Sequence, residues 1–434
     1  MAEAPPPPPP PPMSLTVTGV AVIKVQSSLA GIAMLEEKPT SLFETGPDRR
    51  LVFASFTGAV SGTYSPPDGW LLIDFAQHPS GEVTATIAAP RQVRLVRLDR
   101  TATVRANFAL TDAQVANDPF YDDGGRHDDT SMLPYYTGDA VRVAAVGEHL
   151  AVALRTGRNA LVAYRFNYGS DGFVRAWRTL AEPGLTMFPR SVTSGSYDAF
   201  GQLDNHWRVF LDADAAGNIA VASVSNPIYV RLFPAHADYF RQPIDAVYGA
   251  LVTRIAANGQ RLGATVVDTA EVAEVHGVRM AGGDVAVFGR VYSDRRPDGG
   301  GWNAYVARVG FADGGLRYYR LLDVDRGDVV FDAAPLAQGR LLVAGATGYT
   351  QNPTGASISE DSAPLLAVLE ADGTLKARVA VPAGARHNQL RSLAARDGNW
   401  LVGGMVNGPG THSADGNPAA LTADGVVREL TVGQ

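Results

Sequence analysis

The sequence predicts an all-β protein, and within that class a single β-propeller of about six four-stranded antiparallel blades, with a seventh left open. Three observations predict it. Short runs rich in Val, Leu and Ala mark strands, Asp-Gly or Asn-Gly pairs join neighbouring runs, and the same order of elements returns along the chain. Apolar residues nowhere recur at helical spacing over a dozen positions, so no helix is expected inside the units. A pair of β-sandwiches is the main alternative.

The repeat is clearest in the C-terminal third of the chain. Strands that each end on glycine open the pattern, at residues 284–289, 340–345 and 400–404. Each is followed by a second apolar run and then by an Asp-Gly pair, at Asp313, Asp372 and Asp424. A further run precedes each of them, at residues 275–280, 331–337 and 390–395, which makes four strands per unit. The closing glycines recur at roughly 55–60 residues, a spacing typical of a propeller blade with generous loops.

The turn residues indicate how the strands are joined. A two-residue type I′ turn needs positive φ at both central positions, which Asp-Gly and Asn-Gly tolerate. Two looser units lie upstream, at residues 141–180 and 207–267. A first unit is expected from strands at 51–56, 70–75, 93–98 and 103–108, with an extra strand at 83–87. Residues 15–25 are left over, either as a strand that ties the N-terminus to the last blade or as the edge of a seventh.

The repeat also resembles a known type. The segments Asn303-Ala-Tyr-Val-Ala-Arg-Val309, Asp313-Gly314 and Gly339-Arg-Leu-Leu-Val-Ala-Gly345 resemble the bacterial SBBP and delta-60 type repeats. The likeness covers the last three units well and the middle two weakly. It implies a β-propeller in an exported protein or lipoprotein. It implies no activity, because these repeats share no catalytic residues.

Composition narrows the class of partner. The chain has 434 residues and a formal net charge of −7, with no run of Lys or Arg, so neither nucleic acid nor anionic lipid is an expected partner. It contains no Cys, which excludes disulfides, thiolate metal sites and cysteine nucleophiles. No stretch approaches eighteen uninterrupted apolar residues, so no membrane span is expected.

The N-terminus differs in composition from the rest. Residues 5–12 are all proline, which forms a stiff polyproline II spacer and no core, so we divide the chain into a disordered spacer at 1–13 and the propeller at 14–434. Such spacers often follow the lipidated cysteine of bacterial lipoproteins. The start looks like an added Met on a mature chain whose targeting segment was removed. We therefore expect an extracytoplasmic protein, in the periplasm or at the outer-membrane surface, with a removed lipid anchor as its only membrane contact. A low-complexity tail without a role is the alternative.

The long connections are expected on one face of the propeller. In a four-stranded blade, the connection between the second and third strands and the link to the next blade leave on one face, and the two hairpin turns leave on the other. The long segments all fall in the first group: 111–138, 181–205, 226–248, 293–301, 347–362 and 406–416. Connections longer than about 12 residues are usually functional or disordered. The sequence thus predicts one elaborated face and one plain face.

The first three long segments are rich in aromatic residues, which are typical of recognition surfaces. The alternative is that these rings pack beneath their own loops. The candidate ligand-binding residues are Phe120, Tyr121, Tyr135, Tyr136, Tyr197, Phe200, Tyr239 and Phe240.

An acidic cluster in the first long segment is the candidate metal site. Its carboxylates would suit calcium, which takes six to eight oxygen ligands, although their spacing matches no known ligand loop and a solvated acidic loop remains the alternative. The candidate ligands are Asp122, Asp123, Asp128 and Asp129. No other cofactor is expected. Residues 212–218 resemble the start of an EF-hand but lack its distal Glu, since Ser223 stands there, so a turn is expected.

Two classes of function follow. The first is an exported, monomeric, non-catalytic binding or scaffolding module whose long-loop face recognises a protein partner or a glycan. Neither an H-E-x-x-H nor a G-x-S-x-G motif is present to mark an enzyme. The alternative is a hydrolase or lyase acting on a polysaccharide at the mouth of the central channel. It would need two carboxylates, from a set such as Asp122, Asp128, Asp198 and Glu360, brought together by the fold.

Overall fold

The computed structural model describes residues 12–38, 48–89, 92–110, 141–155, 161–170, 172–182, 209–224, 249–269, 273–293, 301–325, 327–348, 362–384, 387–408 and 423–432. In these ranges the chain forms strands β1 to β28, which pair in seven four-stranded sheets, and every pairing is antiparallel. The protein is therefore a seven-bladed β-propeller. The expected fold class is confirmed, and the blade number is the seven that had been left open.

The strands of each blade follow one another from the axis outwards, except that the outermost strand of blade 7 comes from the N-terminus. Blades 1 to 3 are β2 (Ala21–Ser28), β3 (Gly31–Lys38), β4 (Asp48–Ala54) and β5 (Val60–Tyr64); β6 (Leu71–Gln77), β7 (Val83–Ala89), β8 (Gln92–Leu98) and β9 (Val104–Leu110); β10 (Val141–Val146), β11 (His149–Arg155), β12 (Leu161–Gly169) and β13 (Gly172–Glu182).

The remaining blades repeat this order. Blades 4 to 7 are β14 (Phe210–Ala213), β15 (Ile219–Val224), β16 (Gly249–Ile255) and β17 (Arg261–Asp268); β18 (Ala273–Ala281), β19 (Asp284–Ser293), β20 (Gly301–Gly310) and β21 (Leu316–Leu322); β22 (Val329–Pro335), β23 (Leu341–Thr347), β24 (Ala363–Leu369) and β25 (Leu375–Arg378); β26 (His387–Arg396), β27 (Asn399–Gly408), β28 (Asp424–Leu430) and β1 (Ser14–Thr18).

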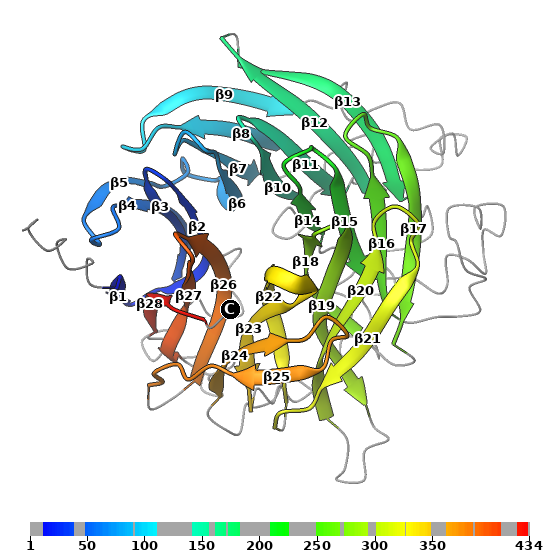
Figure 1. The fold of residues 1–434 in the computed structure, drawn as a ribbon. Helices are drawn as coiled ribbons and strands as arrows, with labels where there is room; N and C mark the ends of the chain where they lie inside the picture. The colour runs from blue at the N-terminus through cyan, green and yellow to red at the C-terminus, as the bar shows by residue number, and fades with distance from the viewer. Residues whose placement is uncertain are drawn as a thin grey trace, which may run out of the picture.

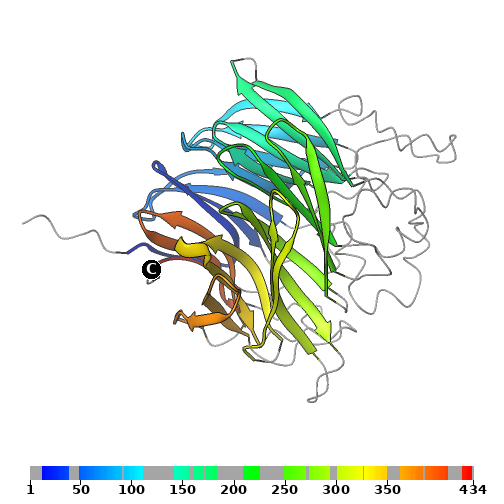
Figure 2. The ribbon, with the colours of Figure 1, turned by 45° about the vertical axis from the view of Figure 1, so that its right-hand side comes forward.

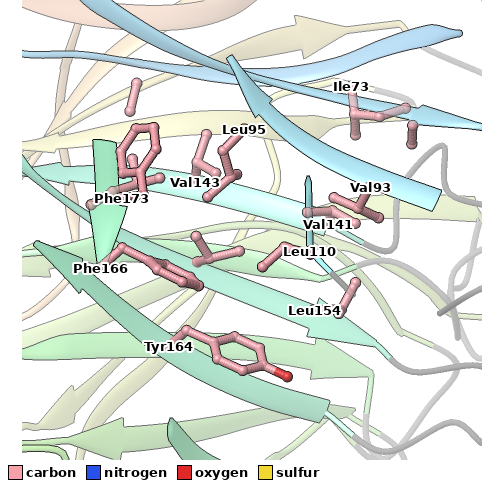
Figure 3. Close-up of a cluster of buried hydrophobic side chains, with 14 of the residues drawn as sticks. Ile73, Val93, Leu95, Leu110, Val141, Val143, Leu154, Tyr164, Phe166 and Phe173 are labelled. Carbon is pink, nitrogen blue, oxygen red and sulfur yellow. The ribbon is translucent and has the colours of Figure 1, made fainter. Parts of the chain in front are cut away.

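The blades stand around a central axis that is lined by the first strand of each (Figure 1). An oblique view shows each blade as a twisted sheet beside its neighbours (Figure 2). A buried hydrophobic cluster joins every pair of neighbouring blades. Between blades 2 and 3, for example, Leu95 and Leu110 face Val143, Phe166 and Phe173 (Figure 3). The core is therefore a ring of interfaces in which the apolar face of each sheet packs against the next sheet.

The expectation of a single unit before residue 141 was wrong, because this part of the chain forms blades 1 and 2. Residues 51–56 and 70–75, expected in one unit, lie in β4 and in β6 of the next blade. The turns explain the error. The hairpins at 29–30, 55–59, 78–82 and 99–103 contain no Asp-Gly or Asn-Gly pair, so the signal that marks the later blades is missing.

The N-terminus closes the ring through blade 7. In the β1–β28 pair, Ser14 lies opposite Arg428 and Thr18 opposite Asp424. Met13 extends the pairing, since its backbone N donates to Glu429 Oε2 at 3.0 Å and its carbonyl accepts from Glu429 N at 2.9 Å. The expected strand that ties the N-terminus to the last blade is confirmed for residues 14–18, whereas residues 21–25 belong to β2, the inner strand of blade 1.

Deleting residues 1–19 should destabilise the propeller, because β28 would become an unpaired edge. At about 1 kcal/mol for each lost ladder hydrogen bond, we expect a loss of roughly 3–5 kcal/mol in the free energy of unfolding, measured by denaturant titration. Deleting residues 1–11 alone is the matched control and should change it by less than about 0.5 kcal/mol. Equal stability of the two deletions would contradict a closing role for β1.

A buried histidine fastens blade 2 to blade 3. His78, in the first turn of blade 2, contacts Thr84 Oγ1 through Nε2 at 2.8 Å and the carbonyl of Gly147 through Nδ1 at 2.9 Å. Beside it, Ser80 Oγ donates to Glu148 Oε2 at 2.9 Å. Burial, reinforced by the nearby Arg97, lowers the pKa of His78 to about 4, so its neutral form is built into the fold.

The stability of the protein should fall on acidification because of His78. The unfolded chain takes up the proton near pH 6.5 and the folded chain only near pH 4. Above about pH 7, His78 is neutral in both states and costs no stability. By pH 5, the unfolded chain binds this proton and the folded chain does not, which lowers the free energy of unfolding by about 2 kcal/mol. Thermal unfolding of the wild type and of His78→Gln at pH 7 and pH 5 tests this. The variant should lose less stability over that interval, and parallel curves would show that His78 is not responsible.

Candidate functional site

The described strands separate the connections into two faces. Every hairpin turn on the face formed by the first-to-second and third-to-fourth strand connections has at most five residues, from 29–30 in blade 1 to 397–398 in blade 7. We call this the plain face. We call the opposite face the long-loop face. On it lie the strand ends that flank residues 111–140, 183–209, 225–248, 294–300, 348–362 and 409–423. The strand order thus assigns the long connections to one face, as the sequence predicts.

The residues that the sequence singles out for this face lie outside the described residues. This holds for all eight aromatic candidates, from Phe120 to Phe240, and for the acidic candidates Asp122, Asp123, Asp128 and Asp129. The carboxylates of the enzymatic alternative, including Asp198 and Glu360, also lie outside them. Aromatic recognition and calcium binding therefore remain predictions.

The inner strands bring polar side chains to the channel by a repeated irregularity. In five of them the pairing with the second strand slips by one residue, between Val22 and Lys24, Leu72 and Asp74, Val275 and Gly277, Val330 and Asp332, and Leu390 and Ser392. A bulge of this kind bends the strand and redirects the next side chain. We give the name axial ring to six polar inner-strand residues that bond to a neighbouring blade, five of them on these strands and Asp212 on β14. Its members are Lys24, Asp74, Asp212, Arg279, Asp332 and Ser392.

Four members of the axial ring fasten a blade to the next one. Each accepts a hydrogen bond from a backbone N–H on the inner strand of the following blade. The pairs are Asp74 Oδ2 with Val143 N at 3.0 Å, Asp212 Oδ2 with Met280 N at 2.8 Å, Asp332 Oδ2 with Leu393 N at 2.8 Å, and Ser392 Oγ with Val25 N at 3.1 Å. The last pair joins blade 7 to blade 1. The ring is therefore part of the fold as well as the lining of the channel.

Charge pairs complete the axial ring. Lys24 Nζ donates to Asp74 Oδ1 at 2.7 Å, across blades 1 and 2. Arg279 holds Asp332 through two bonds of 2.9 Å, across blades 5 and 6, and its Nη1 lies 3.5 Å from Asp212 Oδ1. Burial lowers the pKa of Lys24, while its pairing with Asp74 opposes that shift. Burial alone would lower the pKa of Arg279, but the carboxylates of Asp332 and Asp212 raise it, and the net effect is a rise.

Asp212 is the most exposed of the three ring carboxylates, and its ion pair with Arg279 is longer than that of Asp332. Asp332 accepts four bonds of 2.8–2.9 Å, two from Arg279, one from Leu393 N and one from its neighbour Ala333 N. Asp212 accepts from Met280 N at 2.8 Å and from the backbone N–H of Ala213, and its Oδ1 lies 3.5 Å from Arg279 Nη1. Burial raises its pKa, Arg279 opposes that rise, and the negative charge of Asp332 adds to it.

A pocket of about 470 Å³ opens where the channel meets the plain face. It is lined by the ends of the inner strands β14, β18, β22 and β26 at their first turns. Its charged lining consists of Asp212, Asp214 and Arg279. The larger apolar side chains around it are Met280, Pro335, Leu393 and Trp400. Its volume falls within the range of about 300–1,000 Å³ typical of small-molecule sites.

Sequence reasoning missed this pocket. It treated residues 212–218 as one turn, and the structure confirms a turn at 214–218, where Asp214 Oδ1 accepts from Asn218 N at 2.8 Å. Asp212 belongs to β14, which ends at Ala213, and lines the pocket instead. A usable signal was present, since single charged residues interrupt apolar inner strands at Ile73-Asp74-Phe75 and Phe331-Asp332-Ala333.

The described ranges lack two further features. They contain no group of three or more His, Cys, Asp or Glu side chains that could hold a metal ion. They also contain no helix long and apolar enough to cross a membrane.

Comparison with known proteins shows only distant structural likeness. No family model matches the chain, and no curated protein matches it. Solved structures similar to it include the WD40 β-propeller domain of Doa1, with a TM-score of 0.46, 10% identity and 95% of each chain covered. The RRP9 WD40 repeats have a TM-score of 0.49 and 8% identity, with 96% of this chain and 97% of that chain covered. A catalytically inactive virginiamycin B lyase from Staphylococcus aureus with quinupristin has a TM-score of 0.47 and 8% identity, with 96% and 99% covered.

Replacing Asp332 with Ala should strongly destabilise the protein. The change leaves Arg279 without its two-bonded partner and Leu393 N without its acceptor, and such losses at a buried pair cost about 3–5 kcal/mol. Denaturant unfolding measures the effect. Glu370→Ala is the control, because it removes one partner of the exposed Lys376–Glu370 pair and should cost less than about 1 kcal/mol. Similar losses in both variants would contradict the structural role of the axial ring.

Proposed function

We propose that this propeller is an exported, non-catalytic binding module that recognises a protein partner or a glycan through its long-loop face. The separation of connections between the faces carries the proposal: the plain face has turns of at most five residues, and segments such as 111–140, 183–209 and 225–248 all join strand ends at the other face. The six long segments are flanked by twelve strand ends, and strand ends fixed on a rigid ring can support variable loops without disturbing the core. Loops carried by a rigid scaffold are where recognition residues concentrate.

The composition of the long segments supports the same function. They contain Phe120, Tyr121, Tyr135 and Tyr136, within a chain whose net charge is −7. Aromatic anchors provide large contact areas, and they are enriched among residues that dominate binding energy. The net negative charge favours a neutral or basic partner surface over a polyanion.

The enzymatic alternative has less support from the described channel. The plain-face pocket is lined by two carboxylates, Asp212 and Asp214, and Asp212 forms an ion pair with Arg279, whose guanidinium is also held by Asp332 behind the pocket wall. Asp332 already accepts four hydrogen bonds, so it has no lone pair left to take a proton from a substrate or water. A hydrolase or lyase would have to use carboxylates such as Asp122 and Asp198.

Export, monomeric state and calcium binding belong to the same proposal. The resemblance of residues 303–345 to SBBP and delta-60 type repeats, together with the proline run at 5–12, supports an extracytoplasmic protein or lipoprotein. Protease treatment of intact source cells would degrade a surface-exposed form, and fractionation would identify a periplasmic one. Calcium is proposed only for the acidic segment at Asp122–Asp129, where it would organise the longest connection.

Binding should depend on the longest connection and not on the plain face. Residues 111–140 can be replaced by a twelve-residue Gly-Ser linker, whose reach of about 19 Å suffices to cross one blade of four strands spaced about 4.8 Å apart. We expect the melting temperature to be retained and the affinity for a glycan-array hit or a captured protein to fall more than tenfold. Replacing Phe120, Tyr121, Tyr135 and Tyr136 with Ala should have the same effect.

The matched control lies on the opposite face. Leu29 is 94% exposed in the first turn of blade 1, so Leu29→Ser removes a large apolar side chain from the plain face without touching the core. The control should bind like the wild type. A ligand that is lost from Leu29→Ser but retained by the linker variant would show that recognition belongs to the plain face and would overturn the proposed function.

A further inference from the structure

The pocket at the plain-face end of the channel is separate from the long-loop face, and the proposed function does not use it. Its polar side comes from blades 4 and 5, through Asp212 and Arg279, and its apolar side includes Trp400 of blade 7. These residues are far apart in the sequence. Only the closure of the ring brings them to one cavity of about 470 Å³.

The charges around this pocket favour a cationic ligand. Its charged lining residues are Asp212, Asp214 and Arg279. The positive charge of Arg279 is already balanced by Asp332, which holds it through two bonds of 2.9 Å. The carboxylates of Asp212 and Asp214 therefore leave the pocket net negative. Of the other ring cations, Lys24 is paired with Asp74 at 2.7 Å.

Asp212 is the group able to recognise such a ligand. Its side chain is 19% exposed, so it can be reached from the pocket, whereas the side chain of Asp332 is 7% exposed. Its Oδ2 accepts from Met280 N, and its Oδ1 forms only a long ion pair of 3.5 Å with Arg279 Nη1, whose two bonds to Asp332 are shorter, at 2.9 Å. Burial raises the pKa of this carboxyl, so a cation placed beside it would relieve an unfavourable negative charge.

The walls indicate the shape of the ligand. Trp400 is half-buried at the pocket, and an indole face attracts an ammonium group as well as an apolar ring. Met280 and Leu393 add apolar surface. A small apolar body next to a single charged group matches this combination, because ligand pockets bury apolar surface and use a few polar groups to fix orientation.

We propose that the pocket at the plain-face end of the channel binds a small organic amine. The ammonium group of the amine pairs with Asp212, and its aromatic or aliphatic body lies against Trp400, Met280 and Leu393. This site is independent of the recognition that we propose for the long-loop face, so either can fail without the other.

Isothermal titration of the full chain at pH 7.5 with 2-phenylethylamine and tryptamine tests the proposal, with phenylacetate as the anionic counterpart of the same size. We expect at least one of the amines to bind with a Kd below 1 mM and phenylacetate to bind at least tenfold more weakly. Asp212→Asn keeps an oxygen for Met280 N but removes the charge, and it should weaken amine binding at least tenfold. Trp400→Leu should weaken it about threefold or more.

Asp74→Asn is the matched control. Asp74 is also a ring carboxylate that accepts a backbone N–H of the next blade, but it does not line the pocket. Amine affinity in this variant should stay within twofold of wild type, which separates loss of the site from loss of the ring. The proposal is overturned if neither amine binds, if phenylacetate binds as tightly as the amines, or if Asp74→Asn reduces affinity as much as Asp212→Asn.

Discussion

The unpaired inner edge of every blade is the constraint on which the rest of this propeller depends. Each inner strand pairs on one side only, with the second strand of its own blade, and the other side faces the axis. Backbone N–H groups on that side need acceptors, because buried unpaired donors are costly. The ring side chains meet this need from the preceding blade, as Asp74 does for Val143 and Asp332 for Leu393. The polar residues of the channel are therefore required by the fold itself, because closing seven sheets into a ring leaves the backbone N–H groups of the inner strands without strand partners.

The fold could be predicted because most of its information is local. Strands near 284–289 and 340–345, with turns at Asp313-Gly314 and Asp372-Gly373, define blades 5 and 6 almost without tertiary knowledge. In blade 7 the expected turn at Asp424-Gly425 was wrong, because these residues begin β28 and the fourth strand is β1. Blades 1 and 2 were merged because their turns use other residues, such as Leu29-Ala30, and so lack the local signal. The closing strand at Ser14–Thr18 could only be left as an alternative, since its partner β28 lies at the opposite end of the sequence.

The channel site could not be predicted in the same way. Asp212 and Trp400 are brought to one pocket by four consecutive blades, and neither residue carries a motif. In the sequence, Asp212 also resembled the neighbouring Asp214. In the structure β14 ends between them, so Asp212 lies in the strand and Asp214 lies in the turn. The repeat pattern also did not reveal that one of its charged residues has a structural role. Arg308, within the repeated segment at 303–309, reaches the carbonyl of Ala281 at 2.8 Å in its own blade and that of Gly339 in the next, so it fastens blades together.

The three ring carboxylates show how one structural device leaves room for function at a single point. Asp74 uses one oxygen for Val143 N and the other for Lys24, and Asp332 fills both oxygens with four bonds. Asp212 fastens blade 4 to blade 5 through the bond of Oδ2 to Met280 N and through a long ion pair of 3.5 Å between Oδ1 and Arg279, which Asp332 holds more closely. A carboxylate oxygen in a partly apolar cavity gains more from a close cationic partner than the same group would in water, because the surrounding dielectric is lower. Blade closure therefore fixes where Asp212 lies, and the exposure of this carboxylate beside an already paired Arg279 is the basis of the amine site that we propose at the plain-face end of the channel.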